Sequence, residues 1–139
     1  MKRAFMLLAL MLVAGAALAQ DKVQPPGVTL TIDTGKTTAV VSWTAPGDAC
    51  TNAQLAEYDV RYSSSAITEC NFTSAAAFAG WSGPTFPGGT DCADVSGLTC
   101  NTTYYVAWKV KDSAGNWSDI VTTTMTTKGC NTNQEVVCS

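Results

Sequence analysis

Residues 104–111 read YYVAWKVK, and this stretch carries the clearest pattern in the chain. Every second position holds a large apolar or aromatic side chain, namely Tyr104, Val106, Trp108 and Val110. The opposing set is Tyr105, Ala107, Lys109 and Lys111. A period of two with β-branched and aromatic residues predicts a strand. One face of that strand should be buried and the other should face water, as in an antiparallel sheet.

Working outward from this strand, we find the same kind of alternation in residues 28–32, 39–44 and 58–62, and we predict further strands at 90–95 and 120–126. Turn-forming residues separate them, at 33–36, 45–48 and 112–116. Residues 67–78 leave two interpretations open, a short helical turn or an irregular edge strand. Residues 80–89 contain four glycines and two prolines, which predicts a loop. About seven short strands without a long helix indicate an all-β antiparallel β-sandwich.

The N-terminus has the organisation of a signal peptide. Lys2 and Arg3 precede a run of about 15 apolar residues that is too short to span a bilayer comfortably. Residues 1–19 are therefore predicted to be removed by cleavage between Ala19 and Gln20, although a retained anchor helix is the alternative. The remaining chain divides into a domain at 20–127 and a cysteine-containing tail at 128–139. This organisation predicts a secreted or periplasmic protein with no membrane span after cleavage.

Composition excludes several classes of function. The chain of 139 residues contains no histidine, so histidine-based triads and histidine metal sites are excluded. Removing Lys2 and Arg3 leaves six basic side chains against eleven acidic ones, a net charge of −5. A phosphate backbone would be repelled by this charge, and we expect no nucleic-acid partner.

All six cysteines follow the predicted leader: Cys50, Cys70, Cys92, Cys100, Cys130 and Cys138. An even number behind a secretion signal predicts three disulfides. Zinc is the competing interpretation, and the absence of histidine and of a C-x-x-C motif argues against it. Six cysteines allow fifteen pairings. Short loops favour the hypothesis Cys92–Cys100, Cys130–Cys138 and Cys50–Cys70.

Several stretches resemble a fibronectin type III domain, in the versions common in secreted bacterial proteins. The matching segments are VSWTAPGD at 41–48, YDVRYS at 58–63, ITECNF at 67–72, VSGL at 95–98, NTTYY at 101–105 and DSAGNWS at 112–118. Each segment alone is weakly specific, but their order and spacing are distinctive. The resemblance extends roughly from Pro25 to Thr127 and implies an immunoglobulin-like sandwich.

The resemblance also implies roles for particular side chains. Trp43 matches the core tryptophan of the second strand, and Leu98 and Tyr104 match a corner in which the tyrosine hydroxyl bonds to nearby backbone. Trp108 stands where the family usually has an aliphatic residue. We therefore expect an aromatic core built around Trp43, Trp108 and Tyr104. The family normally lacks cysteines, and the tail after Thr127 lies outside its pattern.

Nothing in the sequence indicates catalysis. Asp91 and Asp94 are three residues apart in a predicted strand, which places them on opposite faces and not together as an acid–base pair. Asp112, Asn116 and Asp119 surround a turn, but their spacing does not match a calcium loop, and local backbone bonding explains them better. We expect no enzyme activity, no metal and no cofactor.

The function predicted is a non-catalytic protein-binding or structural module acting through protein–protein contact. Its partner would be an unidentified extracellular or periplasmic protein, or another copy of the chain. The alternative is a carbohydrate-binding module in which Trp81 and Phe86 stack on a polysaccharide. A different interpretation of Trp81 is that it folds over the edge of the sandwich and covers the core.

Overall fold

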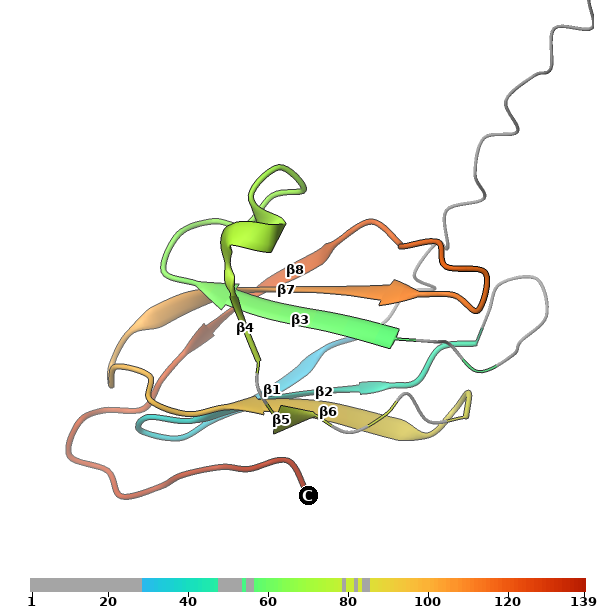
Figure 1. The fold of residues 1–139 in the computed structure, drawn as a ribbon. Helices are drawn as coiled ribbons and strands as arrows, with labels where there is room; N and C mark the ends of the chain where they lie inside the picture. Colours follow the sequence, from blue (N-terminus) through green and yellow to red (C-terminus); the bar gives the residue numbers. More distant parts are fainter. Residues whose placement is uncertain (1–28, 48–53, 55–56, 79, 82, 84–85) are drawn as a thin grey trace, which may run out of the picture.

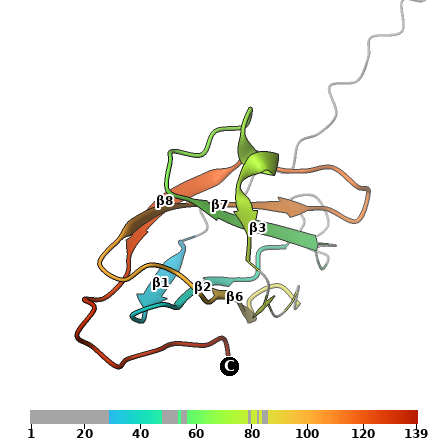
Figure 2. The same cartoon turned by 60° about the vertical axis from the view of Figure 1, so that its left-hand side comes forward.

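The protein is described from a computed structural model, in which all residues except 1–28, 48–53, 55–56, 79, 82 and 84–85 are placed. The described residues form two antiparallel sheets of four strands each (Figure 1). The strands of the first sheet, in spatial order, are β1 (Thr31–Thr34), β2 (Ala39–Thr44), β6 (Thr90–Val95) and β5 (Gly80–Trp81). Those of the second are β4 (Ala76–Ala77), β3 (Glu57–Ser63), β7 (Thr103–Lys111) and β8 (Val121–Thr126). In the described part of the chain, one 3₁₀ turn, η1 (Phe72–Ser74), lies between β3 and β4. The turned view shows the two layers facing each other (Figure 2).

The longer strands form where the alternating pattern predicts them. β2 and β6 have the predicted bounds, and β3, β7 and β8 agree with the prediction to within one residue at each end. Within the described residues β1 runs from Thr31 to Thr34 and so extends past the end of the predicted strand at 28–32, because Gly35 N–H donates to Thr38 O at 2.8 Å and closes a hairpin that pairs Thr34 with Ala39. The prediction of a loop from residue 80 is wrong for 80–81, which form β5 beside β6.

The main core lies between the sheets and is rich in aromatic side chains. Trp43, Tyr58 and Trp108 pack edge-on or tilted against one another, with ring centroids 4.9 to 5.8 Å apart. Tyr104 is only half-buried, and its ring contacts Tyr62 at the rim of the core. Tyr58 therefore takes the central place that the sequence analysis assigned to Tyr104, because its strand position faces the two tryptophans directly.

A second, smaller core lies on the outer face of the β3–β7–β8 sheet. Ile67 and Phe72 pack there against Ala107, which is completely buried. The alternation in β7 predicted that Ala107 would face water. Residues 64–75 fold back over this part of the sheet, and the outer face is therefore partly covered (Figure 1).

The C-terminal residues after β8 have no regular secondary structure but run along the β1–β2–β6 sheet (Figure 2). Lys128 N–H donates to Gly35 O at 2.9 Å, and Lys36 N–H donates to Gln134 O at 2.7 Å. No helix within the described ranges is long and apolar enough to cross a membrane.

Candidate functional site

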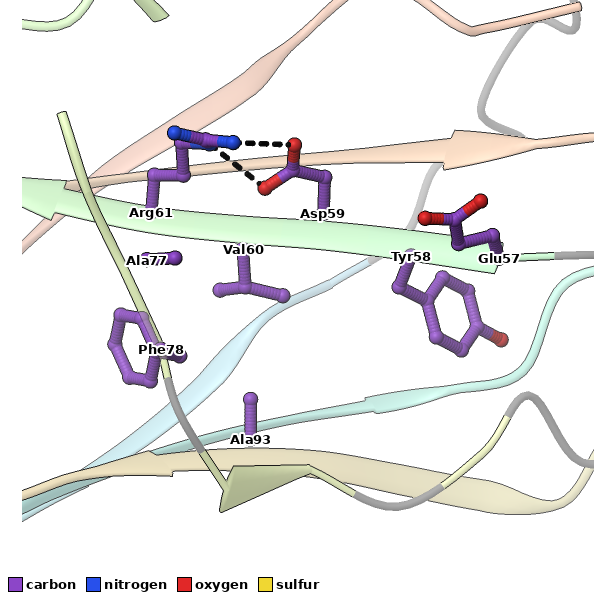
Figure 3. Close-up of a pocket in the computed structure, with 8 residues that line it drawn as sticks. All are labelled: Glu57, Tyr58, Asp59, Val60, Arg61, Ala77, Phe78 and Ala93. Atoms are coloured by element: carbon purple, nitrogen blue, oxygen red, sulfur yellow. Dashed lines mark hydrogen bonds and ion pairs between the residues drawn. The ribbon is translucent and has the colours of Figure 1, made fainter. Parts of the chain in front are cut away.

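A groove of about 240 Å³ opens along the edge of β3, close to the point where β4 leaves it (Figure 3). Five consecutive residues of β3 line it together with residues from β4, the following crossover and β6. They are Glu57, Tyr58, Asp59, Val60, Arg61, Ala77, Phe78 and Ala93. Because consecutive strand residues point to opposite faces, a lining of this kind means that the groove follows the edge of the strand.

The groove exists because the chain changes sheets here. β4 pairs with β3 only through Ala77 and Ala76, opposite Arg61 and Tyr62. Phe78 N–H then donates to Val60 O at 2.9 Å, and the chain crosses to the other sheet. In Figure 3 Val60, Phe78 and Ala93 project into the space between the two sheets. Ala77 and Ala93 have the smallest side chains in this lining, which leaves the space between the larger ones open.

The outward rim of the groove carries charge. Asp59 accepts two hydrogen bonds from Arg61, at 2.8 Å from Nε and 3.1 Å from Nη2. Glu57 is paired with Lys111, whose Nζ lies 3.0 Å from Glu57 Oε2, and its side chain remains 47% exposed. Both carboxylates of the rim are therefore paired with a cation, Asp59 with Arg61 and Glu57 with Lys111.

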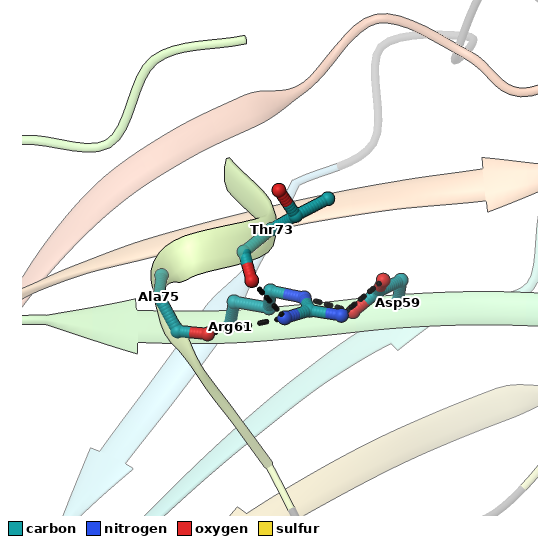
Figure 4. Close-up of polar contacts among 4 residues, drawn as sticks. All are labelled: Asp59, Arg61, Thr73 and Ala75. Atoms are coloured by element: carbon teal, nitrogen blue, oxygen red, sulfur yellow. Dashed lines mark hydrogen bonds and ion pairs between the residues drawn. The ribbon is translucent and has the colours of Figure 1, made fainter. Parts of the chain in front are cut away.

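Arg61 also holds the segment that covers the outer face of the sheet. Its Nη1 donates to Thr73 O at 3.0 Å and to Ala75 O at 3.1 Å (Figure 4). The guanidinium additionally lies over the Phe72 ring, 5.2 Å from its centroid. One planar, multidentate side chain thereby connects β3 to the 3₁₀ turn, a geometry that lysine could not reproduce.

The same segment is fixed at two further points. Glu69 Oε1 accepts a hydrogen bond from Ile120 N–H at 2.7 Å, which ties the segment to the start of β8. Inside the segment, the Asn71 side chain accepts a hydrogen bond from Thr68 N–H at 2.7 Å and donates one to Ala66 O at 3.0 Å. Lys109 Nζ lies 4.3 Å from the centroid of the buried Phe72 ring, a cation–π contact.

A fully buried carboxylate, Asp91, lies at one end of the aromatic core. It is the register partner of Trp43, and a Cβ added at Gly83 would collide with its oxygens. Burial raises the pKa of the Tyr58 phenol above its usual value, the Trp43 indole opposes that rise, and the Asp91 carboxylate adds to it. Within the described residues, the indole nitrogens of Trp43 and Trp108 are buried and have no hydrogen-bond partner. Asp91, Tyr58 and Trp43 thus form a polar cluster within the core. The alternation pattern did not predict this cluster, and the one sequence feature that pointed to it is an aspartate next to the Gly-rich residues 80–89.

The tyrosine corner has the geometry that the family resemblance implied. Thr99 N–H donates to the Tyr104 hydroxyl at 3.0 Å, and Leu98 is buried below it, 5% exposed. Asn101, in the same corner, has a positive φ of 49°. Trp43 and Trp108 are 2% and 0% exposed and occupy the centre of the core.

The hypothesis for the disulfides is wrong in both short loops. Cys92 is bonded to Cys138 and Cys100 to Cys130, at sequence separations of 46 and 30. Cys70 is free and exposed, and Cys50 lies outside the described residues. The short-loop argument failed because each bond crosses between the tail and the sandwich, whose proximity depends on the path of the tail.

The tail is also held by Glu135. Its carboxylate accepts hydrogen bonds from Thr38 Oγ1 at 2.7 Å, Thr37 Oγ1 at 2.8 Å and Thr37 N–H at 3.1 Å. The Thr38 bond, followed by those from Thr37, holds the pKa of Glu135 below its usual value. A Cβ at Gly35 would lie 2.7 Å from the Glu135 backbone, so the tail is packed directly on the β1–β2 turn.

The two aromatic residues of the predicted carbohydrate loop are placed as follows. Phe86 is 76% exposed. Trp81 lies in β5 and pairs with Ala93 through its backbone, while its side chain lies outside the described part of the chain.

The residues considered for catalysis or metal binding have structural partners. Asp91 and Asp94 lie on opposite faces of β6, as their spacing predicts, and Asp94 accepts a hydrogen bond from Cys138 N–H at 3.0 Å. Asp112 accepts two hydrogen bonds from Asn116, at 2.8 and 3.0 Å, which stabilise the turn after β7. These bonds hold the pKa of Asp112 below its usual value. Across the described residues, no group of three or more cysteine, aspartate and glutamate side chains could hold a metal ion.

Comparisons with known proteins agree with this architecture. The family model of the fibronectin type III domain matches residues 23–124. The third fibronectin III domain of the human KIAA0343 protein is similar at 17% identity and a TM-score of 0.50, covering 88% of this chain and 98% of that one.

Two further solved structures are similar at lower scores. The sixth fibronectin type III domain of human fibronectin type III domain containing protein 3 matches at 20% identity and a TM-score of 0.44, covering 84% of this chain and 92% of that one. The sensor domain of the anti-sigma factor RsgI4 in Pseudobacteroides cellulosolvens matches at 18% identity and a TM-score of 0.43, covering 76% and 99%.

No curated protein is similar enough in sequence to count as a match. The family model covers well over half of the chain, and the two-sheet sandwich with its tyrosine corner agrees with it. Domains of this family are generally non-enzymatic modules. The chain belongs to the fibronectin type III domain family.

Proposed function

We propose that this chain is a secreted or periplasmic, non-catalytic module that acts through protein–protein contact, with residues 1–19 removed on export. The observation that carries the proposal is the groove at the β3 edge, which both apolar and charged side chains line. Exposed edges of this kind are common binding surfaces for extended segments of other proteins. The partner would be an extracellular or periplasmic protein, or a second copy of the chain.

Export is supported by the two disulfides that hold the tail to the sandwich. Disulfides persist in oxidising compartments and are rare in the cytosol. The basic and apolar N-terminal sequence supports the same localisation.

Crosslinked affinity capture tests the proposal. The chain from residue 20 onward would be incubated with the native secreted or periplasmic fraction, crosslinked and recovered, and the linked peptides identified by mass spectrometry. Recovery of a defined protein, or of the chain itself, with reproducible crosslinked residues is the expected result. Recovery of no crosslinked protein would overturn the proposal.

A carbohydrate-binding module is the second candidate, and the exposure of Phe86 is the observation that favours it. An exposed aromatic ring on a loop can stack on a sugar ring. Retention of the chain on immobilised polysaccharide, abolished in Trp81→Ala and Phe86→Ala without a large loss of thermal stability, would support this function. A large loss of stability in Trp81→Ala would instead indicate that Trp81 covers the core.

A further inference from the structure

We propose that the surface formed by the β1–β2 turn and the outer face of β6 is a capture site for an extended segment of the form Glu-x-x-Cys. The tail of a second copy of the chain supplies this segment, and a disulfide to Cys92 joins the two copies. In each chain the same surface holds the chain's own tail. The inference gives a surface and a linkage for self-association, which the proposed function includes, and it does not depend on the β3 groove.

The β1–β2 turn recognises the carboxylate of a glutamate. Glu135 accepts hydrogen bonds from Thr37 N–H, Thr37 Oγ1 and Thr38 Oγ1, at 3.1, 2.8 and 2.7 Å. Thr38 is only 9% exposed, so one of these donors is the hydroxyl of a buried side chain. The positive charge of Lys36 also favours the ionised carboxylate. A glutamine would keep the shape but offer a neutral acceptor, and hydrogen bonds to a charged acceptor are roughly twice as strong.

Backbone contacts after the glutamate set the register of the segment. Val136 N–H donates to Thr38 Oγ1 at 2.8 Å, and Cys138 N–H donates to Asp94 Oδ2 at 3.0 Å. These contacts hold Cys138 beside Cys92, with Cα atoms 5.8 Å apart. A segment bound in this way therefore brings a cysteine to Cys92 when that cysteine follows the glutamate by three positions.

Apart from its disulfides, the tail is held mainly by hydrogen bonds and has little buried apolar surface. Val137 is 72% exposed, and none of residues 131–139 is buried. Segments held in this way detach at a low cost in free energy. Until the bond from Cys92 to Cys138 closes, the tail therefore leaves the surface readily and exposes it to another copy. The chain's own tail has an effective concentration on the order of 1 mM, so a second copy competes when the protein approaches that concentration.

The link between two copies is a two-electron oxidation. The Cys92 thiol of one copy and the Cys138 thiol of the second copy lose two protons and two electrons and form one disulfide. A disulfide oxidant such as oxidised glutathione takes up these protons and electrons and becomes two thiols. In a reciprocal pair each copy gives its tail and receives one, so both sets of tail contacts are kept.

Disulfide capture of a peptide tests the site. The full chain with Cys138→Ser, which cannot close its own bond to Cys92, would be incubated with oxidised glutathione and the peptide acetyl-Asn-Gln-Glu-Val-Val-Cys-Ser-amide. Peptide mapping then measures the peptide bound to Cys92 and to Cys70, an exposed thiol outside the site. Cys92 is expected to capture this peptide roughly fivefold more than the same peptide with glutamine in place of glutamate. Cys70 should capture both peptides equally.

Two glycine variants locate the site. A Cβ at Gly35 would lie 2.7 Å from the Glu135 backbone, whereas a Cβ at Gly129 would meet nothing within 4 Å. Gly35→Ala should therefore remove the preference of Cys92 for the glutamate peptide, and Gly129→Ala should leave that preference unchanged. The preference is the readout, because a change in folding alone alters the capture of both peptides together.

A mixture of ¹⁵N-labelled and unlabelled chains, without substitutions, tests the second copy. The mixture would be reduced and then reoxidised, and the peptides that join Cys92 to Cys138 would be identified by mass spectrometry. At ~1 mM protein about a quarter of these peptides should contain both isotopes, because about half of the bonds form between copies. At ~0.01 mM protein almost none should.

Equal capture of the two peptides at Cys92, the same preference at Cys70, or single-isotope bonds alone at ~1 mM protein would each overturn the inference. If Cys138→Ser does not fold, the isotope experiment decides the question. Failure of the inference is distinguishable from failure of the proposed function. Crosslinked capture of a defined protein other than the chain itself would leave the protein-binding function in place without this site.

Discussion

The hydroxyl of Tyr104 makes a local hydrogen bond, to Thr99 N–H, that the family resemblance implied. Leu98, six residues before Tyr104, is buried. Thr99, which follows Leu98, donates its backbone N–H to the Tyr104 hydroxyl. The ring lies at the rim of the core and not at its centre. The corner therefore contributes mainly through its hydrogen bond and the direction it gives to the chain entering β7.

Tyr104→Phe is expected to lower the free energy of unfolding by about 1 kcal/mol, because it removes one hydrogen bond and leaves Thr99 N–H without it. Tyr105→Phe, on the exposed side of the same strand, is the matched control and should change stability little. Urea denaturation followed by tryptophan fluorescence measures both. Equal stability of the two variants would contradict the role given to the Tyr104 hydroxyl.

Glu135 gives the tail a pH-dependent attachment. Its folded-state pKa is held below the usual value by hydrogen bonds from Thr38 and Thr37, so the unfolded chain binds a proton more readily than the folded one. The stabilisation is fully present above the usual pKa of 4.5 and is lost as the pH falls through the lower folded-state pKa.

Glu135→Gln should therefore lower Tm at pH 7, and the difference from the unchanged chain should shrink between pH ~5 and ~2. Thermal unfolding followed by circular dichroism at a series of pH values measures this difference. A difference in Tm that stays constant down to pH ~2 would show that charge on Glu135 does not contribute to holding the tail.

At the scale of elements, residues 64–75 add a cover to the outer face of one of the two sheets. They cover Ala107 on the outer face of β7. Arg61 of β3 donates a hydrogen bond to this segment, and Glu69 within the segment accepts one from Ile120 N–H, just before β8. The alternation of β7 predicted that its outer face is exposed to water. That prediction is correct only for the part of the face that residues 64–75 do not cover. A pattern of period two specifies which side chains share a face, but not what packs on that face.

Arg61→Lys should loosen this cover, because lysine keeps the charge but cannot bond to Asp59, Thr73 and Ala75 together. We expect amide hydrogen exchange to increase in residues 72–75, with a loss of about 1 to 2 kcal/mol in local stability. Exchange in the centre of β7 should change much less. Unchanged protection of residues 72–75 would contradict the assignment of Arg61 as their anchor.

At the scale of the whole molecule, the two disulfides attach the C-terminal tail to the sandwich at two separate places. Cys92–Cys138 attaches the tail to β6, and Cys100–Cys130 attaches it to the corner before β7. Loop-closure entropy for separations of 46 and 30 residues corresponds to about 4 kcal/mol for each bond. That is a large fraction of the stability of an ordinary domain.

Peptide mapping without reduction should therefore recover Cys92 linked to Cys138 and Cys100 linked to Cys130. The paired replacement Cys100→Ser with Cys130→Ser should lower the free energy of unfolding by about 2 to 4 kcal/mol. Cys70→Ser, at an exposed free thiol, is the control and should have little effect. Recovery of a Cys92–Cys100 peptide would contradict the arrangement of the tail.

The sequence by itself determined the strands and the sandwich, because these depend on a period of two and on turn residues, and its resemblance to the fibronectin type III family implied the tyrosine corner. It also placed Trp43, Trp108 and Leu98 in the core, and the fibronectin type III resemblance agrees with the family model. Tyr58 could have been chosen from its alternation, but the pattern alone does not rank inward-facing rings by depth.

Only the tertiary structure decided the disulfide partners, the cover formed by residues 64–75 and the groove at the β3 edge. Each depends on segments that are distant in sequence and meet only after the sheets have packed. Cys92 and Cys138 are 46 residues apart, with Cα atoms 5.8 Å from each other. The groove likewise requires Val60, Phe78 and Ala93, which come from one strand of each sheet and from the crossover between them. No local pattern carries that information, because the distance between two segments depends on the path of all the chain that joins them.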